Sequence, residues 1–433
     1  MYINKQTSPI VYLGFNQLGS HITRCTQGDL TIFSIKSPNQ VIQSYHSQQT
    51  DLSIATQFFT SQALFGASYR HSEPEVSSNF AMFKAQRGYK LAAQNKYIID
   101  GRVISIKSNK AVIAVITYRG IYILNIENTE LKPQFYINLP FSLRYSTAVD
   151  LTTVFDKFPT NIQCTANLIA YPLSDQKGLV AVQDVSSIPA GCSAPIQSMV
   201  TKTEHGTMHI TPEVFSNLHP SALHNDQPST RWEFTAHTDP VQCVAFSRDG
   251  TLLATASRKG TRIRVWSVQF RTQTVECLRT SKGTQCTIYS LAFSADNRLL
   301  ACSGSSQTIH VFDLSASEQT GMAAGFMKFA RTLGGIMTPK AQSPGQKENV
   351  KELHSALQIR PDLPPGQSVP QTTLTFFDPD RKDATPVVDS PHPFYQLNVA
   401  DDSDGLAIYS ITPGDTGLIL SETNCFKLSK ILP

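Results

Sequence analysis

The sequence predicts an all-β protein, a seven-bladed β-propeller of the WD40 type, as a single domain over residues 1–433. Three observations support this fold class: an internal repeat between Ala236 and Leu314, strand-length apolar runs separated by turn residues along most of the chain, and the composition. With 433 residues, 40% hydrophobic and 16% charged, the chain can bury a large β-rich core. Its 25 prolines argue against a long helical protein.

The repeat consists of two tandem copies of one pattern. Each copy has a strand ending in Ala-Phe-Ser, a turn, a second apolar strand, a polar turn and a third strand. Phe246 and Phe293 lie 47 positions apart, close to the repeat length of WD propellers. One residue is lost after Thr308, so Arg264 of the first copy matches His310 of the second.

The repeat has the local signals of a propeller blade. The apolar runs 241–246, 252–256 and 263–268 have the length of strands, and Arg248-Asp249-Gly250 is a strong hairpin signal because Asp and Gly tolerate the positive φ of tight turns. One blade cannot bury both faces of its sheet, so two clear blades imply several more in the chain.

The repeat also resembles the PROPPIN family of propellers, which includes the WIPI-type autophagy proteins. About 80 residues carry the resemblance, in the phrases Ala236-His237, Ala254-Thr255-Ala256-Ser257-Arg258-Lys259-Gly260-Thr261, Ile263-Arg264-Val265, Ile288-Tyr289-Ser290-Leu291-Ala292-Phe293-Ser294 and Thr308-Ile309-His310-Val311-Phe312. The resemblance implies a seven-bladed propeller that binds polyphosphoinositides and takes part in autophagosome formation or endolysosomal membrane traffic.

About seven blade-sized groups can be counted along the chain. Besides the repeat, they are predicted at residues 1–35, weakly at 51–100, at 102–126, at 167–185, and in two closing groups at 372–399 and 404–421. We expect strand 372–377 to complete the sheet that the second long insertion interrupts.

Two insertions interrupt the strand pattern. Residues 186–230 are rich in Ser, Thr, Pro and His and are predicted to form a surface insertion, with histidines at no spacing typical of a metal site. Residues 315–370 show no strand pattern and correspond to the long loop that PROPPINs carry in their sixth blade.

The second insertion contains an amphipathic segment, residues 322–337. Its apolar residues follow helical spacing and are Met322, Phe326, Phe329, Leu333, Ile336 and Met337, with Lys328 and Arg331 on the opposite face. Such a segment suggests a membrane-inserting helix, as the resemblance also implies; a helix packed on the propeller or a chance periodicity in a loop are the alternatives.

The resemblance implies two shallow pockets on the propeller edge, one on each side of a Phe-Arg-Arg-Gly motif that gives an arginine to each. Arginine binds phosphate bidentately, and hydroxyl groups and Gly-flanked amides add donors. We therefore expect these phosphoinositide-binding residues in the two copies and the segment between them: His237, Ser257, Lys259, Gly260, Thr261, Arg264, Arg279, Lys282, Ser303, Ser305, Thr308 and His310.

The motif itself is altered in this chain. Leu278-Arg279-Thr280-Ser281 can occupy its place, or alternatively Ser281-Lys282-Gly283-Thr284. Either alignment lacks one guanidinium. A hydrogen bond to a charged group contributes roughly 1.5–3 kcal/mol, so we expect one pocket to be about one to two orders of magnitude weaker unless Lys282 compensates. Gly304 stands where the first copy has Ser257, which indicates the second pocket as the weaker one.

Several candidate residues also have a purely structural interpretation. His237 matches the WD-repeat histidine that belongs to an internal hydrogen-bond network, and Arg264 could pair with a neighbouring acid. Ser257, Thr261, Ser303 and Thr308 are ordinary turn residues in any WD protein.

Other function classes find little support in the sequence. There is no GxSxG, phosphate loop or HExxH, so no enzyme is predicted. The eight scattered cysteines include no CxxC pair, and we expect no metal and no cofactor. A net charge of +4 is too small for a bulk nucleic-acid binder, and without a leader or a membrane span the protein is predicted to be cytosolic.

The sequence therefore predicts a peripheral membrane effector that binds phosphatidylinositol 3-phosphate, the 3,5-bisphosphate, or both. Its predicted partners are phosphoinositide-containing membranes and a protein of the autophagy machinery. The alternative is a WD40 scaffold that has lost lipid binding; a pure scaffold needs neither the cations at 279 and 282 nor the stripe at 322–337.

Overall fold

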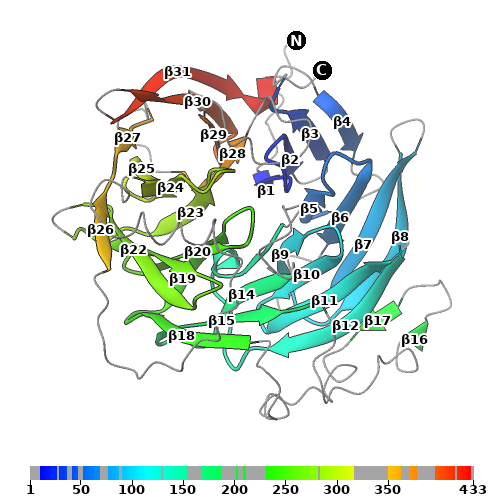
Figure 1. Cartoon of the computed structure of the whole chain (residues 1–433). Coiled ribbons are helices and arrows are strands. Elements are labelled where there is room, and N and C mark those ends of the chain that lie inside the picture. The colour runs from blue at the N-terminus through cyan, green and yellow to red at the C-terminus, as the bar shows by residue number, and fades with distance from the viewer. Residues whose placement is uncertain are drawn as a thin grey trace, which may run out of the picture.

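Seven sheets, each containing four antiparallel strands, surround a central channel in the computed structural model (Figure 1). The structure describes residues 10–26, 29–36, 41–46, 52–68, 77–86, 90–127, 130–153, 167–186, 201–202, 208–210, 231–280, 283–315, 350–361, 370–377, 395–414 and 417–430. The channel encloses about 760 Å³ and is lined mainly by the innermost strand of each sheet. The predicted seven-bladed propeller is confirmed, and we number the sheets as blades along the chain.

The first four blades occupy the N-terminal half. Blade 1 consists of β1 (Ile10–Phe15), β2 (His21–Thr26), β3 (Asp29–Ser34) and β4 (Val41–His46). Blade 2 consists of β5 (Ile54–Gln57), β6 (Ala63–Ser68), β7 (Ser78–Gln86) and β8 (Lys90–Ile99). Blade 3 consists of β9 (Val103–Ser108), β10 (Val112–Thr117), β11 (Gly120–Glu127) and β12 (Glu130–Asn138). After the 3-10 turn η1 (Ser146–Ala148), blade 4 consists of β13 (Asp150–Leu151), β14 (Leu168–Pro172), β15 (Gly178–Asp184) and β18 (Arg231–His237).

The last three blades contain the repeat and the C-terminal strands. Blade 5 consists of β19 (Val241–Phe246), β20 (Leu252–Ser257), β21 (Arg262–Ser267) and β22 (Thr272–Leu278). Blade 6 consists of β23 (Ile288–Phe293), β24 (Leu299–Gly304), β25 (Ile309–Asp313) and β27 (Leu357–Ile359). Blade 7 consists of β28 (Thr372–Phe377), β29 (Tyr395–Asp401), β30 (Gly405–Gly414) and β31 (Gly417–Lys427), and the 3-10 turn η4 (Leu428–Lys430) follows.

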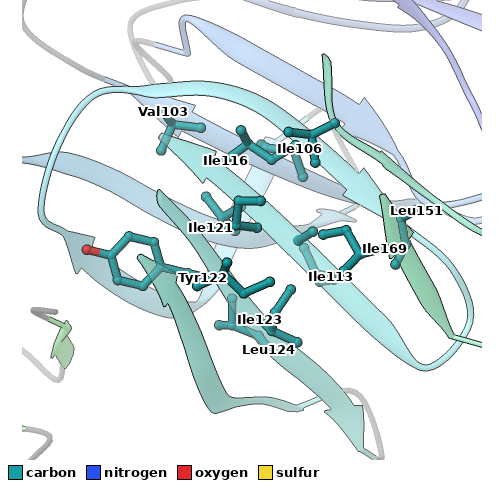
Figure 2. Packing of buried hydrophobic residues seen from close by; sticks show 14 of the residues in the cluster. Val103, Ile106, Ile113, Ile116, Ile121, Tyr122, Ile123, Leu124, Leu151 and Ile169 are labelled. Atoms are coloured by element: carbon teal, nitrogen blue, oxygen red, sulfur yellow. The ribbon is translucent and has the colours of Figure 1, made fainter. Parts of the chain in front are cut away.

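The core lies between neighbouring blades. Strands of Val, Ile, Leu and aromatic residues fill these spaces because both faces of a blade are covered by the next blade on either side. Figure 2 shows one such region, in which side chains of β9, β10 and β11 pack near Leu151 and Ile169 of blade 4. All of the labelled residues in that view are almost fully buried.

The ring closes by side-chain packing between blades 7 and 1. In the described residues, each of these two blades is built from one end of the chain, and no strand is exchanged between them. Their shared core includes Phe33, Phe377 and Leu406. Arg24 of β2 also donates from its Nε to Oδ1 of Asp404, 2.7 Å away and 380 positions later in the sequence.

Both predicted insertions contribute strands, which the sequence analysis did not foresee. Within 186–230, β16 (Thr201–Lys202) and β17 (Met208–Ile210) extend blade 2, because β17 pairs in parallel with β8. Within 315–370, β26 (Lys351–His354) pairs in parallel with β22 of blade 5, and β27 becomes the outer strand of blade 6. These strands are two to four residues long, too short for an alternation pattern to show.

The prediction that residues 372–377 complete the interrupted sheet is wrong. That strand is β28, the first strand of blade 7, and β27 completes blade 6. The amphipathic segment 322–337, with its six predicted membrane-inserting residues, lies outside the described residues. In the described part of the chain, no helix has the length and apolar character needed to cross a membrane.

Candidate functional site

The two repeat copies form blades 5 and 6, and their predicted site residues fall on equivalent strands. Thr255 pairs with Arg264 in blade 5, and Cys302 pairs with His310 in blade 6. The predicted match between Arg264 and His310 is therefore confirmed by the strand register. The two copies nevertheless surround these side chains with different chemistry.

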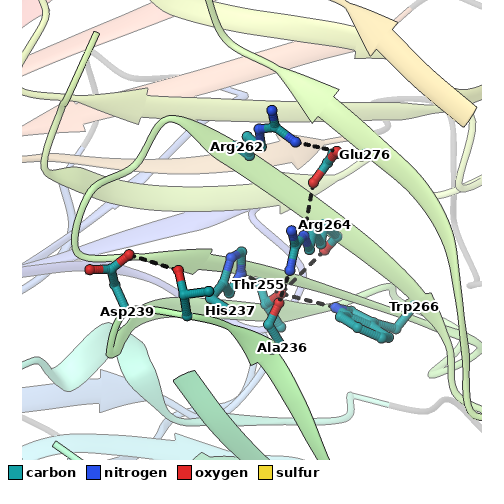
Figure 3. A network of polar contacts seen from close by, with 9 residues as sticks. Ala236, His237, Asp239, Thr255, Arg262, Arg264, Trp266 and Glu276 are labelled. Atoms are coloured by element: carbon teal, nitrogen blue, oxygen red, sulfur yellow. Dashed lines mark hydrogen bonds and ion pairs between the residues drawn. The ribbon is translucent and has the colours of Figure 1, made fainter. Parts of the chain in front are cut away.

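In blade 5, His237 belongs to an internal hydrogen-bond network (Figure 3). Its Nε2 lies 3.0 Å from the Thr255 hydroxyl, which also accepts a hydrogen bond of 3.0 Å from the Trp266 indole. Burial, and then the nearby Arg264 cation, lower the pKa of His237 to about 4, so the ring is neutral near pH 7. The structural interpretation of this histidine matches the geometry.

Arg264 pairs with an acid that the sequence analysis did not single out. Its Nε donates to Oε1 of Glu276 over 2.9 Å, and its Nη1 donates to the Ala236 carbonyl over 2.6 Å. Arg262 binds the other oxygen of the same carboxylate over 2.8 Å. Glu276 is only 7% exposed, so its negative charge offsets both arginines at the place where an incoming phosphate would need them.

The remaining blade 5 candidates lie at the turn between β20 and β21. Lys259 is exposed and its ammonium lies 3.0 Å from Oδ1 of Asp239. Ser257 is buried and Thr261 is half-buried. Gly260 has a φ of +56°, and a Cβ on it would lie 1.8 Å from the Cys286 carbonyl oxygen, so this turn packs directly on the chain that enters blade 6.

Arg279 joins blades 5 and 6 from a buried position. Its guanidinium donates to the Gly260 carbonyl over 3.2 Å, to the Ser306 hydroxyl over 3.1 Å and to the Thr284 carbonyl over 2.5 Å. The side chain is 3% exposed. Arg279 therefore holds three segments together and presents little of its surface to solvent.

His310 is a buried polar side chain of blade 6 for which the described residues offer no hydrogen-bond partner, as is also the case for the hydroxyl of Ser303. His310 is 2% exposed, and among the described residues neither of its ring nitrogens has a hydrogen-bond partner. Burial, followed by the cations Arg279 and Arg360, lowers the pKa of His310 to about 4. Buried polar groups are normally hydrogen-bonded, so this imidazole marks a place that a ligand or water can occupy.

The other blade 6 candidates do not all share the face of His310. Ser303 is adjacent to Cys302 and therefore points to the opposite face; it pairs with Ser290, whose hydroxyl accepts a hydrogen bond from the Leu374 amide of blade 7. Thr308 is half-buried and precedes β25, two residues from His310 on the same face.

Two predicted residues lie at the edge of this region. The Ser305 hydroxyl accepts a hydrogen bond of 3.1 Å from the Thr287 amide in the connection between the blades. Lys282, the predicted compensating cation, lies outside the described residues. The alignment of the altered motif stays a prediction.

Comparison with known proteins places this region within one family. The PROPPIN family model matches residues 222–329. Autophagy-related protein 18 of Eremothecium gossypii is 51% identical over 79 residues, which are 18% of this chain and 14% of that protein. Autophagy-related protein 18 of Kluyveromyces lactis is 24% identical over 318 residues, which are 71% of this chain and 62% of that protein.

In its blade 5 and 6 region this chain is similar to the PROPPIN family. Members are propellers without enzymatic activity, in agreement with the prediction made from the sequence. The first curated relatives are matched over less than two thirds of their own length.

Solved PROPPIN structures share the fold of the whole chain. The structure of Kluyveromyces marxianus Hsv2 superposes with a TM-score of 0.61 at 14% identity, covering 98% of this chain and 99% of the other. KlAtg21, solved in complex with the coiled coil of AgAtg16, superposes with a TM-score of 0.60 at 16% identity, covering 96% and 99%. At these identities the likeness concerns the fold alone.

Proposed function

We propose that this chain is a PROPPIN and binds phosphatidylinositol 3-phosphate or the 3,5-bisphosphate at the rim between blades 5 and 6. It would act as a peripheral membrane effector in autophagosome formation or endolysosomal membrane traffic. The similarity to the PROPPIN family and to the relatives named autophagy-related protein 18 supports the general role. The buried ring of His310, which has no described hydrogen-bond partner, is the observation that supports this location of the head-group site.

The chemistry of the two candidate sites favours blade 6 over blade 5. A phosphoinositide head group is a polyanion, and in blade 5 the Glu276 carboxylate already occupies Arg262 and Arg264. In blade 6 the described charges that act on His310 are both cations, Arg279 and Arg360. We therefore propose one competent site, in blade 6, although Gly304 in the place of Ser257 favours blade 5.

Two further parts of the proposal concern membrane and protein contacts. The apolar stripe at 322–337 would add a second, hydrophobic anchor to a weak head-group site, so that two modest affinities combine. One structural neighbour was solved with a coiled-coil partner. By analogy, we propose that a coiled-coil protein of the autophagy machinery docks on the blades of this chain.

Flotation with liposomes tests the lipid site. We expect wild type to float with liposomes that contain phosphatidylinositol 3-phosphate or the 3,5-bisphosphate and to stay at the bottom with phosphatidylinositol alone. His310→Leu fills the same space without ring nitrogens, so it should abolish flotation while thermal stability stays equal or rises. His21→Leu, in blade 1, is the matched control and should float normally.

The anchor is tested in the same assay by Phe326→Asp combined with Phe329→Asp, which should abolish flotation but leave binding of the soluble head group intact.

The second candidate function is a scaffold that has lost lipid binding, and the ion pairs around Glu276 favour it. If wild type fails to float with liposomes containing any phosphoinositide, the lipid site is overturned and the scaffold function is favoured.

A further inference from the structure

The loop of blade 6 returns to the propeller through an arm that contacts both blades of the proposed site. Residues 351–354 pair in parallel with the end of β22, where His354 lies opposite Leu278, the residue before Arg279. Residues 357–359 then pair with β25. Leu353 is buried in the core shared by blades 5 and 6 and fixes the arm in place.

The register of this arm brings one cation to the face of His310. Ile359 pairs with Ile309 and Gln358 pairs with His310, so the next antiparallel position sets Arg360 across from Thr308. Side chains alternate along a strand, and Arg360 therefore lies on the same face as Gln358, His310 and Thr308. Arg360 is exposed, and the described part of the chain offers it neither an ion pair nor a hydrogen bond.

The electrostatics around His310 agree with this placement. The Arg360 charge contributes to lowering the pKa of His310, as the Arg279 charge does, and no described carboxylate acts in the opposite direction. His237 in blade 5 differs, because Glu276 and Asp239 act on its pKa against the effect of Arg264. The surroundings of His310 thus carry positive charge that is not offset by described acids, next to an imidazole ring that has no described hydrogen-bond partner.

We propose that Arg360 supplies the guanidinium that the altered motif lacks in either alignment, and that it binds a phosphate group together with His310 and Thr308. This inference rests on the proposed function and deepens it by naming a ligand residue outside the motif. The ligand chemistry is a phosphate monoester on an inositol ring, and arginine suits it because its planar fork donates two parallel hydrogen bonds. The return arm of the loop would then be one wall of the pocket.

Isothermal titration with soluble inositol 1,3-bisphosphate and flotation with phosphatidylinositol 3-phosphate liposomes test this assignment on the full chain. Arg360→Ala should weaken both by about tenfold or more, the effect of losing one charged hydrogen bond. Arg360→Lys should recover part of the affinity. Arg119→Ala removes the same charge from an exposed turn of blade 3 and should leave both readouts unchanged.

The outcomes separate this inference from the proposed function. If wild type binds and Arg360→Ala binds equally well, the role of Arg360 is overturned while the blade 6 site stands. If wild type binds neither the soluble head group nor the liposomes, the proposed function itself fails. Arg360→Ala combined with Thr280→Arg should regain binding, since the new guanidinium replaces the lost one. If the double variant binds no better than Arg360→Ala alone, an arginine at 280 does not replace the one at 360. Binding to phosphatidylinositol 3-phosphate liposomes without binding of the soluble head group would contradict a phosphate pocket at Arg360.

Discussion

Single residues show how the two repeat copies have diverged in charge. Arg264 and His310 occupy matched positions, yet the arginine is paired with Glu276 and the histidine has no described partner. Arg279 was expected to face a ligand, but its guanidinium donates hydrogen bonds to Gly260, Thr284 and Ser306. A double substitution of Arg264 and Arg279 would therefore disturb the blades as well as any lipid site, and it is a poor test of binding.

Acidification should destabilise the fold through its buried histidines. The pKa values of His237 and His310 are lowered to about 4, against about 6.5 in an unfolded chain. Below pH 6.5 the unfolded chain binds protons that the folded chain does not, so stability is lost as the pH falls from about 6.5 to 4. Between pH 7 and 5 we expect a loss of about 2 kcal/mol per histidine in urea unfolding.

The charged neighbours of these rings define the control for that experiment. Arg264, Glu276 and Asp239 act on the pKa of His237, and Arg279 and Arg360 act on that of His310. His310→Leu should reduce the pH-dependent loss by one histidine's share. An unchanged pH dependence in that variant would show that His310 is not held neutral by the fold.

The sequence analysis identified candidate residues better than it identified their partners. Arg264 was matched with His310 from the repeat spacing, and His237 was predicted to join an internal network because it matches the common WD-repeat histidine. Glu276 was missed because the pairing of β21 with β22 shifts at a bulge between Val265 and Trp266, and a bulge changes which side chains meet across the strands. Arg360 was missed because β27, the strand that it follows, has only three residues.

At the scale of elements, the turn between β20 and β21 should tolerate no side chain at Gly260. Its φ of +56° alone would strain any other residue by about 1 kcal/mol. A Cβ would in addition lie 1.8 Å from the Cys286 carbonyl oxygen, which forces the turn away from the chain entering blade 6. We expect Gly260→Ala to lower the urea midpoint clearly more than strain alone would.

Gly283 provides the matched control for that substitution. Its φ is +62°, but nothing lies within 4 Å of an added Cβ. Gly283→Ala should therefore show the strain without the clash, and the difference between the two alanine variants measures the contact with Cys286. Equal effects of the two substitutions would mean that the turn relaxes freely.

Elements with a strong alternation pattern were predictable, and short paired segments were not. The strands of blade 3 follow from runs of β-branched residues, and those of blades 5 and 6 follow from the strand-length apolar runs of the repeat. The strands β16, β17, β26 and β27 gain their stability from an existing sheet edge, which supplies most of the hydrogen bonds and the register. Such pairing depends on residues far away in the sequence, and no local pattern encodes it.

At the scale of the whole molecule, closure of the ring depends on contacts between the two ends of the chain. The Arg24 side chain is 4% exposed and that of Asp404 13% exposed. Removing one partner of a buried pair leaves an uncompensated charge, at a cost of about 3–5 kcal/mol. Arg24→Ala should therefore lower the free energy of unfolding by several kcal/mol, as measured by urea denaturation.

The exposed pair Lys132–Glu127 is the comparison for this ion pair. Its distance of 2.6 Å is as short as that of Arg24 and Asp404, but about half of each side chain is exposed. Lys132→Ala should lower the free energy of unfolding far less than Arg24→Ala, since water screens the pair. If the two alanine variants lost similar stability, the Arg24–Asp404 pair would not hold the ring closed.

The strand β26 also has a mechanical consequence. It pairs in parallel with β22 over four residues, from Val275 with Lys351 to Leu278 with His354. A pull on the chain just before Lys351 acts along the strand, so the hydrogen bonds of this ladder share the load in shear and do not open one after another. The pairing that holds the blade 6 loop thus resists tension, and the force enters β22 at Val275 and is shared along its last four residues.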